Sequence, residues 1–215
     1  MELRLIIKNI SQFKTVPGAL PADKAFLPSL FAALGLTAFF TVDVILARHF
    51  LPAFEAGEYA VIATVGKIVY YAAGPIITVM FPIISSRMSS GTSYRLPLLG
   101  SLVISLGVGC VVVIAFYLFS GLIMGTLFGT KYLGAASFLA PYAFFTLLYT
   151  AGSILTYFLL SVSCYRPMVL LFGISLLQGI FIFIFHTSVS QIIGINILVA
   201  SLYLLVVSFY AVKTS

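Results

Sequence analysis

Residues 40–82, FTVDVILARHFLPAFEAGEYAVIATVGKIVYYAAGPIITVMFP, contain two long apolar runs joined by a short turn. Each run contains one embedded charge, Asp43 in the first and Lys67 in the second. Asp43 lies eight residues before Leu51, and Lys67 lies nine residues after Glu58. If both runs are helical, each charge is roughly 12 to 14 Å along its helix from the turn. The two charges are therefore predicted to lie at a similar depth.

Charged side chains inside the hydrocarbon region of a bilayer are costly and normally face a bundle interior or a watery cavity. Asp43 and Lys67 are thus the first candidates for a functional site. Two interpretations carry equal weight at this point. The pair binds substrate or couples transport to an ion, or it is a buried ion pair that only holds two helices together.

The composition predicts a membrane protein. Of 215 residues, 62% are hydrophobic and only 7% are charged, whereas a soluble domain has about a quarter charged residues. The apolar runs are continuous over about twenty residues, which predicts helices rather than a β-barrel. The two cysteines, Cys110 and Cys164, suggest packing, and we predict no metal site and no cofactor.

The fold class predicted is all-α, with six transmembrane helices in one polytopic domain. The expected spans are about 26–48, 58–85, 98–127, 135–160, 167–186 and 191–212. Together they form a predicted six-helix lobe over residues 25–215. Residues 1–24 combine apolar side chains with Arg4, Lys8 and Lys14, which predicts a cytoplasmic amphipathic segment on the membrane surface.

The distribution of basic residues predicts the orientation. If the N-terminus is cytoplasmic, eight basic residues lie inside and two lie outside, which is a strong positive-inside signal. The inner set is Arg4, Lys8, Lys14, Lys24, Arg87, Arg95, Arg166 and Lys213, and the outer set is Arg48 and Lys131. We therefore expect a multi-pass protein of the cell membrane with both termini cytoplasmic. The net charge of +6 reflects this distribution and not a nucleic-acid partner.

Three further features of residues 40–82 concern function. Gly74 and Pro75 predict a kink or hinge, because proline removes a helical hydrogen bond. Tyr70 lies one turn beyond Lys67, where its phenol either hydrogen-bonds a polar ligand or packs in the bundle. Arg48 suits an anionic headgroup, although a solvated salt-bridge cluster is the more ordinary expectation for this residue. That cluster joins Arg48 and His49 to Glu55 and Glu58.

An enzyme is not expected from this composition. Membrane enzymes that bind metal or diphosphate use clusters of acidic, histidine or arginine residues at a membrane face. The chain has five carboxylates in total, and His186 has no neighbouring acid or second histidine. Transport or a structural role remains.

The chain resembles the C-terminal half of the polysaccharide biosynthesis transporters, the oligosaccharide-lipid flippase branch of a superfamily that includes multidrug exporters. The resemblance depends on residues 43–82 together with LFGTKYLGAASFLAPYAF, residues 127–144. Its features are Asp43, the turn Ala56-Gly57-x-Tyr59, Lys67, Phe81-Pro82, Leu127-Phe128-Gly129, Tyr132 and Ala135.

The resemblance implies a two-lobe transporter that moves lipid-linked sugars between membrane leaflets by alternating access. Lys67 and Arg48 would then attract the diphosphate, and Asp43 would hold the lysine or take part in proton or sodium coupling. Six spans correspond to one lobe, so we expect a second six-helix lobe as partner, from a missing N-terminal half, a split gene or a homodimer. The alternatives are a small-molecule exporter of the same superfamily and a truncated membrane scaffold that does not transport.

Overall fold

The computed structural model describes residues 22–214, and six helical segments within them are long and apolar enough to cross a membrane. The elements are α2 (Ala22–Phe50), α3 (Ala53–Gly66), α4 (Ile68–Ser89), α5 (Arg95–Phe128), the short 3₁₀ helix η1 (Thr130–Ala135), α6 (Ala136–Ser161), α7 (Arg166–Ile184) and α8 (Val189–Thr214). The all-α polytopic prediction is confirmed, with α3 and α4 together forming the second span. The predicted surface segment, residues 1–24, lies outside the described residues except for the first residues of α2.

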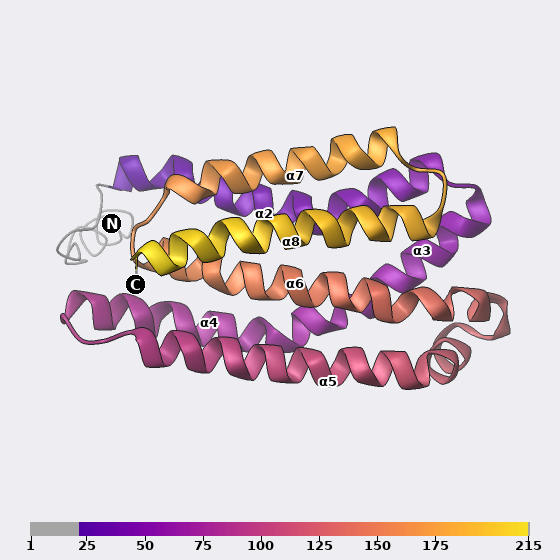
Figure 1. Cartoon of the computed structure of the whole chain (residues 1–215), viewed down its shortest axis with the longest axis horizontal. Coiled ribbons are helices and arrows are strands. Elements are labelled where there is room, and N and C mark those ends of the chain that lie inside the picture. The colour runs from indigo at the N-terminus through magenta and orange to yellow at the C-terminus, as the bar shows by residue number, and fades with distance from the viewer. Residues whose placement is uncertain (1–21, 215) are drawn as a thin grey trace, which may run out of the picture.

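Helix α6 lies at the centre of the bundle. Figure 1 shows α2, α7 and α8 on one side of it and α4 and α5 on the other. In the most apolar part of α6, 78% of the residues are buried, against 17% in α5. Helix α5 therefore presents most of its surface to the outside, and α6 supplies a larger share of the core than any other helix.

The start of α2 and the end of α8 lie at the same end of the bundle (Figure 1), as an even number of spans requires. The connections from α4 to α5 and from α6 to α7 are at that end too. The helix ends beside these connections carry Arg87, Arg95 and Arg166, whereas Arg48 and Lys131 lie at the opposite end. The basic residues thus separate as predicted, and the assignment of the basic end to the cytoplasm stays a prediction.

Many large apolar side chains face outward and several polar ones face inward, as expected for a protein surrounded by lipid. Large apolar residues are exposed along the outer helices, for example Val103 and Val111 on α5 and Leu205 on α8. In contrast, Asp43 and Asn196 are fully buried. In lipid, helices associate through close packing and buried polar contacts rather than by removing apolar surface from water. The fold depends on both kinds of contact.

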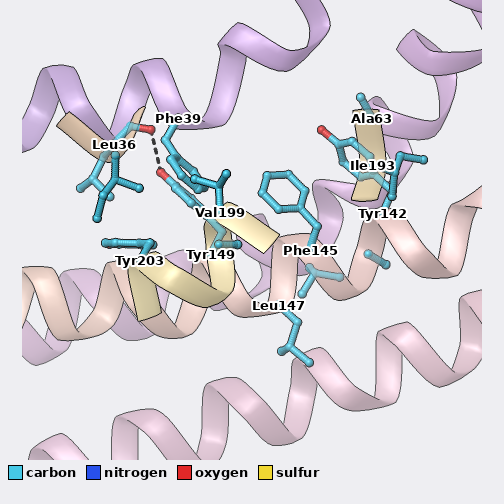
Figure 2. Packing of buried hydrophobic residues seen from close by; sticks show 14 of the residues in the cluster. Leu36, Phe39, Ala63, Tyr142, Phe145, Leu147, Tyr149, Ile193, Val199 and Tyr203 are labelled. Carbon is cyan, nitrogen blue, oxygen red and sulfur yellow. Dashed lines mark hydrogen bonds between the residues drawn. The ribbon is translucent and has the colours of Figure 1, made fainter. Parts of the chain in front are cut away.

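Aromatic packing fills the centre of the bundle (Figure 2). The ring of Phe39 stacks on that of Tyr149 with centroids 5.6 Å apart, and contacts that of Tyr203 at 5.5 Å. The hydroxyl of Tyr149 donates a hydrogen bond to the backbone carbonyl of Leu36 over 2.9 Å. These contacts join α2 to α6 and α8.

Removal of one buried hydroxyl gives a first test of this packing. The oxygens of Tyr203 and Thr156 form a buried hydrogen bond of 2.7 Å between α8 and α6. We expect Tyr203→Phe to lower the free energy of unfolding by about 0.5–1.5 kcal/mol, measured by SDS unfolding in bicelles. Tyr117→Phe is the control, because Tyr117 is 75% exposed on α5. Equal effects of the two substitutions would contradict the prediction.

Candidate functional site: a buried carboxylate and a groove lysine

Asp43 is buried because it occupies the inward stripe of α2. The buried residues of this helix recur at three- and four-residue spacing, which is the period of one helical face. They are Ala32, Gly35, Leu36, Phe39, Asp43 and Ala47. Asn196 likewise lies on the buried face of α8, one turn after Ile192 and one turn before Val199 and Ala200. Helical periodicity alone therefore directs both polar side chains into the bundle.

One oxygen of the Asp43 carboxylate accepts three hydrogen bonds. Oδ2 lies 2.8 Å from the hydroxyl of Tyr59 on α3 and 2.7 Å from the hydroxyl of Tyr142 on α6. The amide nitrogen Nδ2 of Asn196 on α8 lies 3.3 Å away. Neutral donors from three helices thus stabilise the negative charge of a residue on a fourth. Hydrogen bonds to a charged group are the stronger class, at about 1.5–3 kcal/mol each.

The polar network continues to α7. The Asn196 amide also donates to the hydroxyl of Tyr59 over 2.9 Å, and Gln178 Nε2 donates to Asn196 Oδ1 over 2.8 Å. Two oxygens remain without a hydrogen bond, Oδ1 of Asp43 and Oε1 of Gln178. Both side chains are fully buried. The network therefore retains acceptor capacity, which is costly in an apolar interior.

Lys67 is paired with Asp43 only loosely. Its Nζ lies 3.9 Å from Oδ1, beyond hydrogen-bonding distance, and 4.6 Å from the ring centroid of Phe40. The side chain of Lys67 is 11% exposed and that of Asp43 is 0% exposed. The carboxylate is thus held mainly by neutral donors, and the ammonium group remains able to bind a further acceptor.

The predicted charge pair is therefore brought together, while the choice between a functional pair and a structural pair remains open. Lys67 also lies at the junction of α3 and α4, where its backbone N–H donates to Ala63 and its carbonyl accepts from Tyr70 and Tyr71. Helix α4 runs without a break through Gly74 and Pro75. The second span is interrupted at Lys67, seven residues before the predicted hinge. A hinge at Gly74-Pro75 stays a prediction.

Two hollows adjoin this junction. The first, the Lys67 groove, has a volume of about 370 Å³ between α2 and the α3–α4 segment, and Thr41, Thr64, Lys67 and Tyr71 are in its wall. The second, the tyrosine cavity, has a volume of about 670 Å³ and is lined by α2, α4, α6 and the α6–α7 turn. Tyr70, the predicted ligand contact, lines the second hollow rather than the first.

Arg48 is separate from this site. It is exposed in the last turn of α2, at the end of the bundle opposite the start of that helix. The predicted salt-bridge cluster is wrong, because within residues 22–214 no ion pair joins Arg48 or His49 to Glu55 or Glu58. Glu58 instead lies against η1, where its Oε1 is 3.3 Å from the position of a Cβ on Gly134. An anionic ligand at Arg48 stays a prediction.

Sequence reasoning missed the neutral members of the network, Tyr59, Tyr142, Gln178 and Asn196. Gln178 and Asn196 carried a usable signal, since they are amides on the inward stripes of otherwise apolar helices. Tyr59 and Tyr142 lie in the stretches that carry the resemblance, but nothing there marks them as polar contacts, because a tyrosine in an apolar run suits packing equally well. Only the three-dimensional structure shows that both hydroxyls meet Asp43.

The site combines a buried carboxylate, a loosely paired ammonium group and adjacent hollows. Among the side chains that the structure describes, residues 26–214, no three His, Cys, Asp or Glu lie close enough to hold a metal ion. The arrangement suits reversible binding of an anion at Lys67, with Asp43 held by neutral donors when the lysine turns away. Comparison of the chain with protein-family models, with curated proteins and with solved structures finds no match.

Proposed function

We propose that the chain is the C-terminal lobe of a transporter that flips lipid-linked oligosaccharide or polysaccharide precursors across the cell membrane by alternating access. The observation that carries the proposal is the environment of Lys67, which is weakly paired and lines a groove at the surface of the bundle. This lysine is embedded in a predicted span and is incompletely neutralised. An intramembrane charge that reaches a groove is a candidate contact for substrate.

The chemistry of Lys67 suits a diphosphate. An ammonium group has three N–H donors, and its pairing with Asp43 is longer than a hydrogen bond. The phosphate oxygens of a lipid carrier would accept these donors when the cargo reaches the groove. Asp43 retains its three neutral donors throughout, so the lysine can exchange partners without leaving a bare carboxylate.

The groove also favours a second lobe as partner. A lysine that lines the bundle surface at mid-depth is costly if hydrocarbon covers it. A second six-helix lobe, placed against α2 and the α3–α4 segment, would enclose the groove and provide an aqueous cavity between the lobes. This partner and the absence of covalent chemistry belong to the proposal.

Transport in native membranes tests the proposal. Vesicles from the host organism contain whatever partner lobe the chain uses, and a fluorescent polyprenyl-diphosphate sugar with an impermeant quencher reports its leaflet. We expect Lys67→Ala to reduce the initial flipping rate at least tenfold, since among the described residues Lys67 supplies the one ammonium group that lines the groove. Lys131→Ala is the control, because Lys131 is exposed at the end of the bundle. An unchanged rate in Lys67→Ala vesicles would refute the proposal.

A small-molecule exporter is the second candidate. The tyrosine cavity favours it, because a hollow of this size with aromatic and aliphatic walls and some hydroxyl groups is typical of sites for drug-sized ligands. The same vesicles distinguish the two candidates. Loss of dye export without loss of sugar-lipid flipping in the Lys67→Ala variant would favour the exporter. Loss of neither activity would favour a membrane scaffold.

A further inference from the structure

The tyrosine cavity is a second hollow, distinct from the Lys67 groove. It lies toward the end of the bundle where α2 begins, between Ser29 on α2, Thr78 on α4 and Leu160 on α6. Its volume of about 670 Å³ falls within the range of about 300–1,000 Å³ that is typical of small-molecule sites. If the basic end of the bundle is cytoplasmic, the cavity lies on the cytoplasmic side of the charge pair.

Three tyrosines of its wall have unpaired hydroxyls. Tyr70, Tyr157 and Tyr165 line the cavity, and within residues 22–214 none of their hydroxyl groups makes a hydrogen bond. The tyrosines of the bundle interior behave differently, because each has a hydrogen-bond partner. These are Tyr59, Tyr142, Tyr149 and Tyr203. The cavity therefore has three hydroxyls in its wall that the fold itself does not use.

The walls that the described residues form carry no formal charge. Its lining consists of hydroxyl, aromatic and aliphatic side chains and one glycine. The nearest charged group along the chain of ring contacts is Lys67, which lies over the ring of Phe40, and that ring contacts Tyr70 at 4.9 Å between centroids. Phe40 therefore stands between the ammonium group and the cavity. The lining residues offer an anion no counter-charge and a cation no carboxylate. Arg166 follows the lining residue Tyr165 in the chain, but it is exposed and is not part of the wall.

We infer that the tyrosine cavity binds a neutral polyhydroxylated ring, such as the hexose unit of a glycolipid. Ring hydroxyls pair with the phenol groups of Tyr70, Tyr157 and Tyr165, and the apolar faces of the sugar lie against the aromatic rings. The inference deepens the proposed function and rests on it for the source of the sugar. The diphosphate then belongs to the Lys67 groove and the uncharged sugar to the cavity, with Phe40 between the two sites.

Photolabelling of the purified full chain in nanodiscs tests the inference. Three probes share one diazirine-bearing octyl chain and differ only in the head group, which is glucoside, alcohol or phosphate. We expect the glucoside to label peptides of α4 and α6 around Tyr70 and Tyr157, and unlabelled octyl glucoside to compete. Equal labelling by the alcohol would indicate a site for acyl chains, and stronger labelling by the phosphate would indicate an anion site. Either result would overturn the inference.

Removal of the hydroxyls provides the matched variants. Tyr157→Phe and Tyr165→Phe keep the rings, and each is expected to weaken competition by octyl glucoside roughly fivefold. Tyr117→Phe, on the exposed face of α5, is expected to leave competition unchanged. Unfolding in SDS checks that the variants keep the fold. Unchanged competition in both cavity variants would contradict the inference, and the three-probe comparison on the wild-type chain stands without any variant.

Labelling and flipping fail independently, because labelling requires neither a partner lobe nor a gradient. Selective labelling by the glucoside with normal flipping in Lys67→Ala vesicles would refute the proposed function alone. Unselective labelling with flipping lost in those vesicles would refute the cavity inference alone. Competition in the same nanodiscs tests whether the bound sugar is free or attached to a lipid. Free glucose and a short lipid-linked glucose should compete equally if the lipid adds no contact, and the lipid-linked form should compete better if it does.

Discussion

Asp43→Ala is expected to lower the free energy of unfolding by about 3–5 kcal/mol, the range observed when one partner of a buried ion pair is removed. The substitution removes the acceptor shared by Tyr59, Tyr142 and Asn196 and leaves Lys67 without a counter-charge. These donors come from α3, α6 and α8, so their loss affects most of the bundle. SDS unfolding in bicelles, followed by near-UV circular dichroism, measures the change.

Lys67→Ala provides the comparison. Asp43 keeps its three neutral donors in this variant, and the lost pairing is longer than a hydrogen bond. We expect a cost of only about 1 kcal/mol, as for an ordinary hydrogen bond. The double variant should cost less than the sum of the two, because no unpaired lysine remains. A cost below about 1 kcal/mol for Asp43→Ala would contradict the central role of the carboxylate.

This comparison decides between the two interpretations of the charge pair. A structural pair predicts that both single variants lose stability to a similar degree and that flipping falls only as the folded fraction falls. A functional pair predicts a stable Lys67→Ala protein that does not transport. The hydrogen bonds of the network converge on Asp43 and not on Lys67, which favours a stable Lys67→Ala protein. The flipping assay then tests whether that stable protein transports.

The fold was predictable because two simple signals determine it. Continuous apolar runs mark the spans, so all six predicted ranges match helices within a few residues. The period of the inward stripe places Asp43 in the core. The interruption at Lys67 was not predicted, because the proline at position 75 suggested a later break. Gly66, a poor helix former directly before Lys67, was the local signal for it.

Of the residues in the site, only the two charged ones, Asp43 and Lys67, were predicted from the sequence. A carboxylate and an ammonium group in apolar runs are conspicuous in any sequence, and their similar depth follows from the helical rise. The neutral donors come from residues 16, 99 and 153 positions away from Asp43. No local pattern relates such distant positions, so tertiary packing alone brings them together. The same reason explains why Arg48, close to Asp43 in the chain, stays outside the network.

Gly66→Ala is expected to destabilise the bundle by about 3 kcal/mol, because glycine is required there for close packing. A Cβ at position 66 would collide with the edge of the Tyr142 ring and would lie 3.2 Å from its Cε1 atom. That ring cannot move freely, since Tyr142 is fully buried, its hydroxyl holds Asp43, and its edge meets Phe145 with centroids 5.3 Å apart. Overpacking costs about 1–3 kcal/mol, and displacement of the ring adds the loss of a charged hydrogen bond.

Gly74→Ala is the matched control for this prediction. A Cβ at position 74 meets nothing within 4 Å, so the substitution should be neutral or should stabilise α4 by up to about 1 kcal/mol. In a Tyr142→Phe background, Gly66→Ala should cost less than in the wild type, since no bond to Asp43 remains to be broken. SDS unfolding of the four proteins measures this coupling. Equal costs of Gly66→Ala in both backgrounds would show that the glycine serves packing only, whereas the expected difference links the α3–α4 junction directly to the carboxylate.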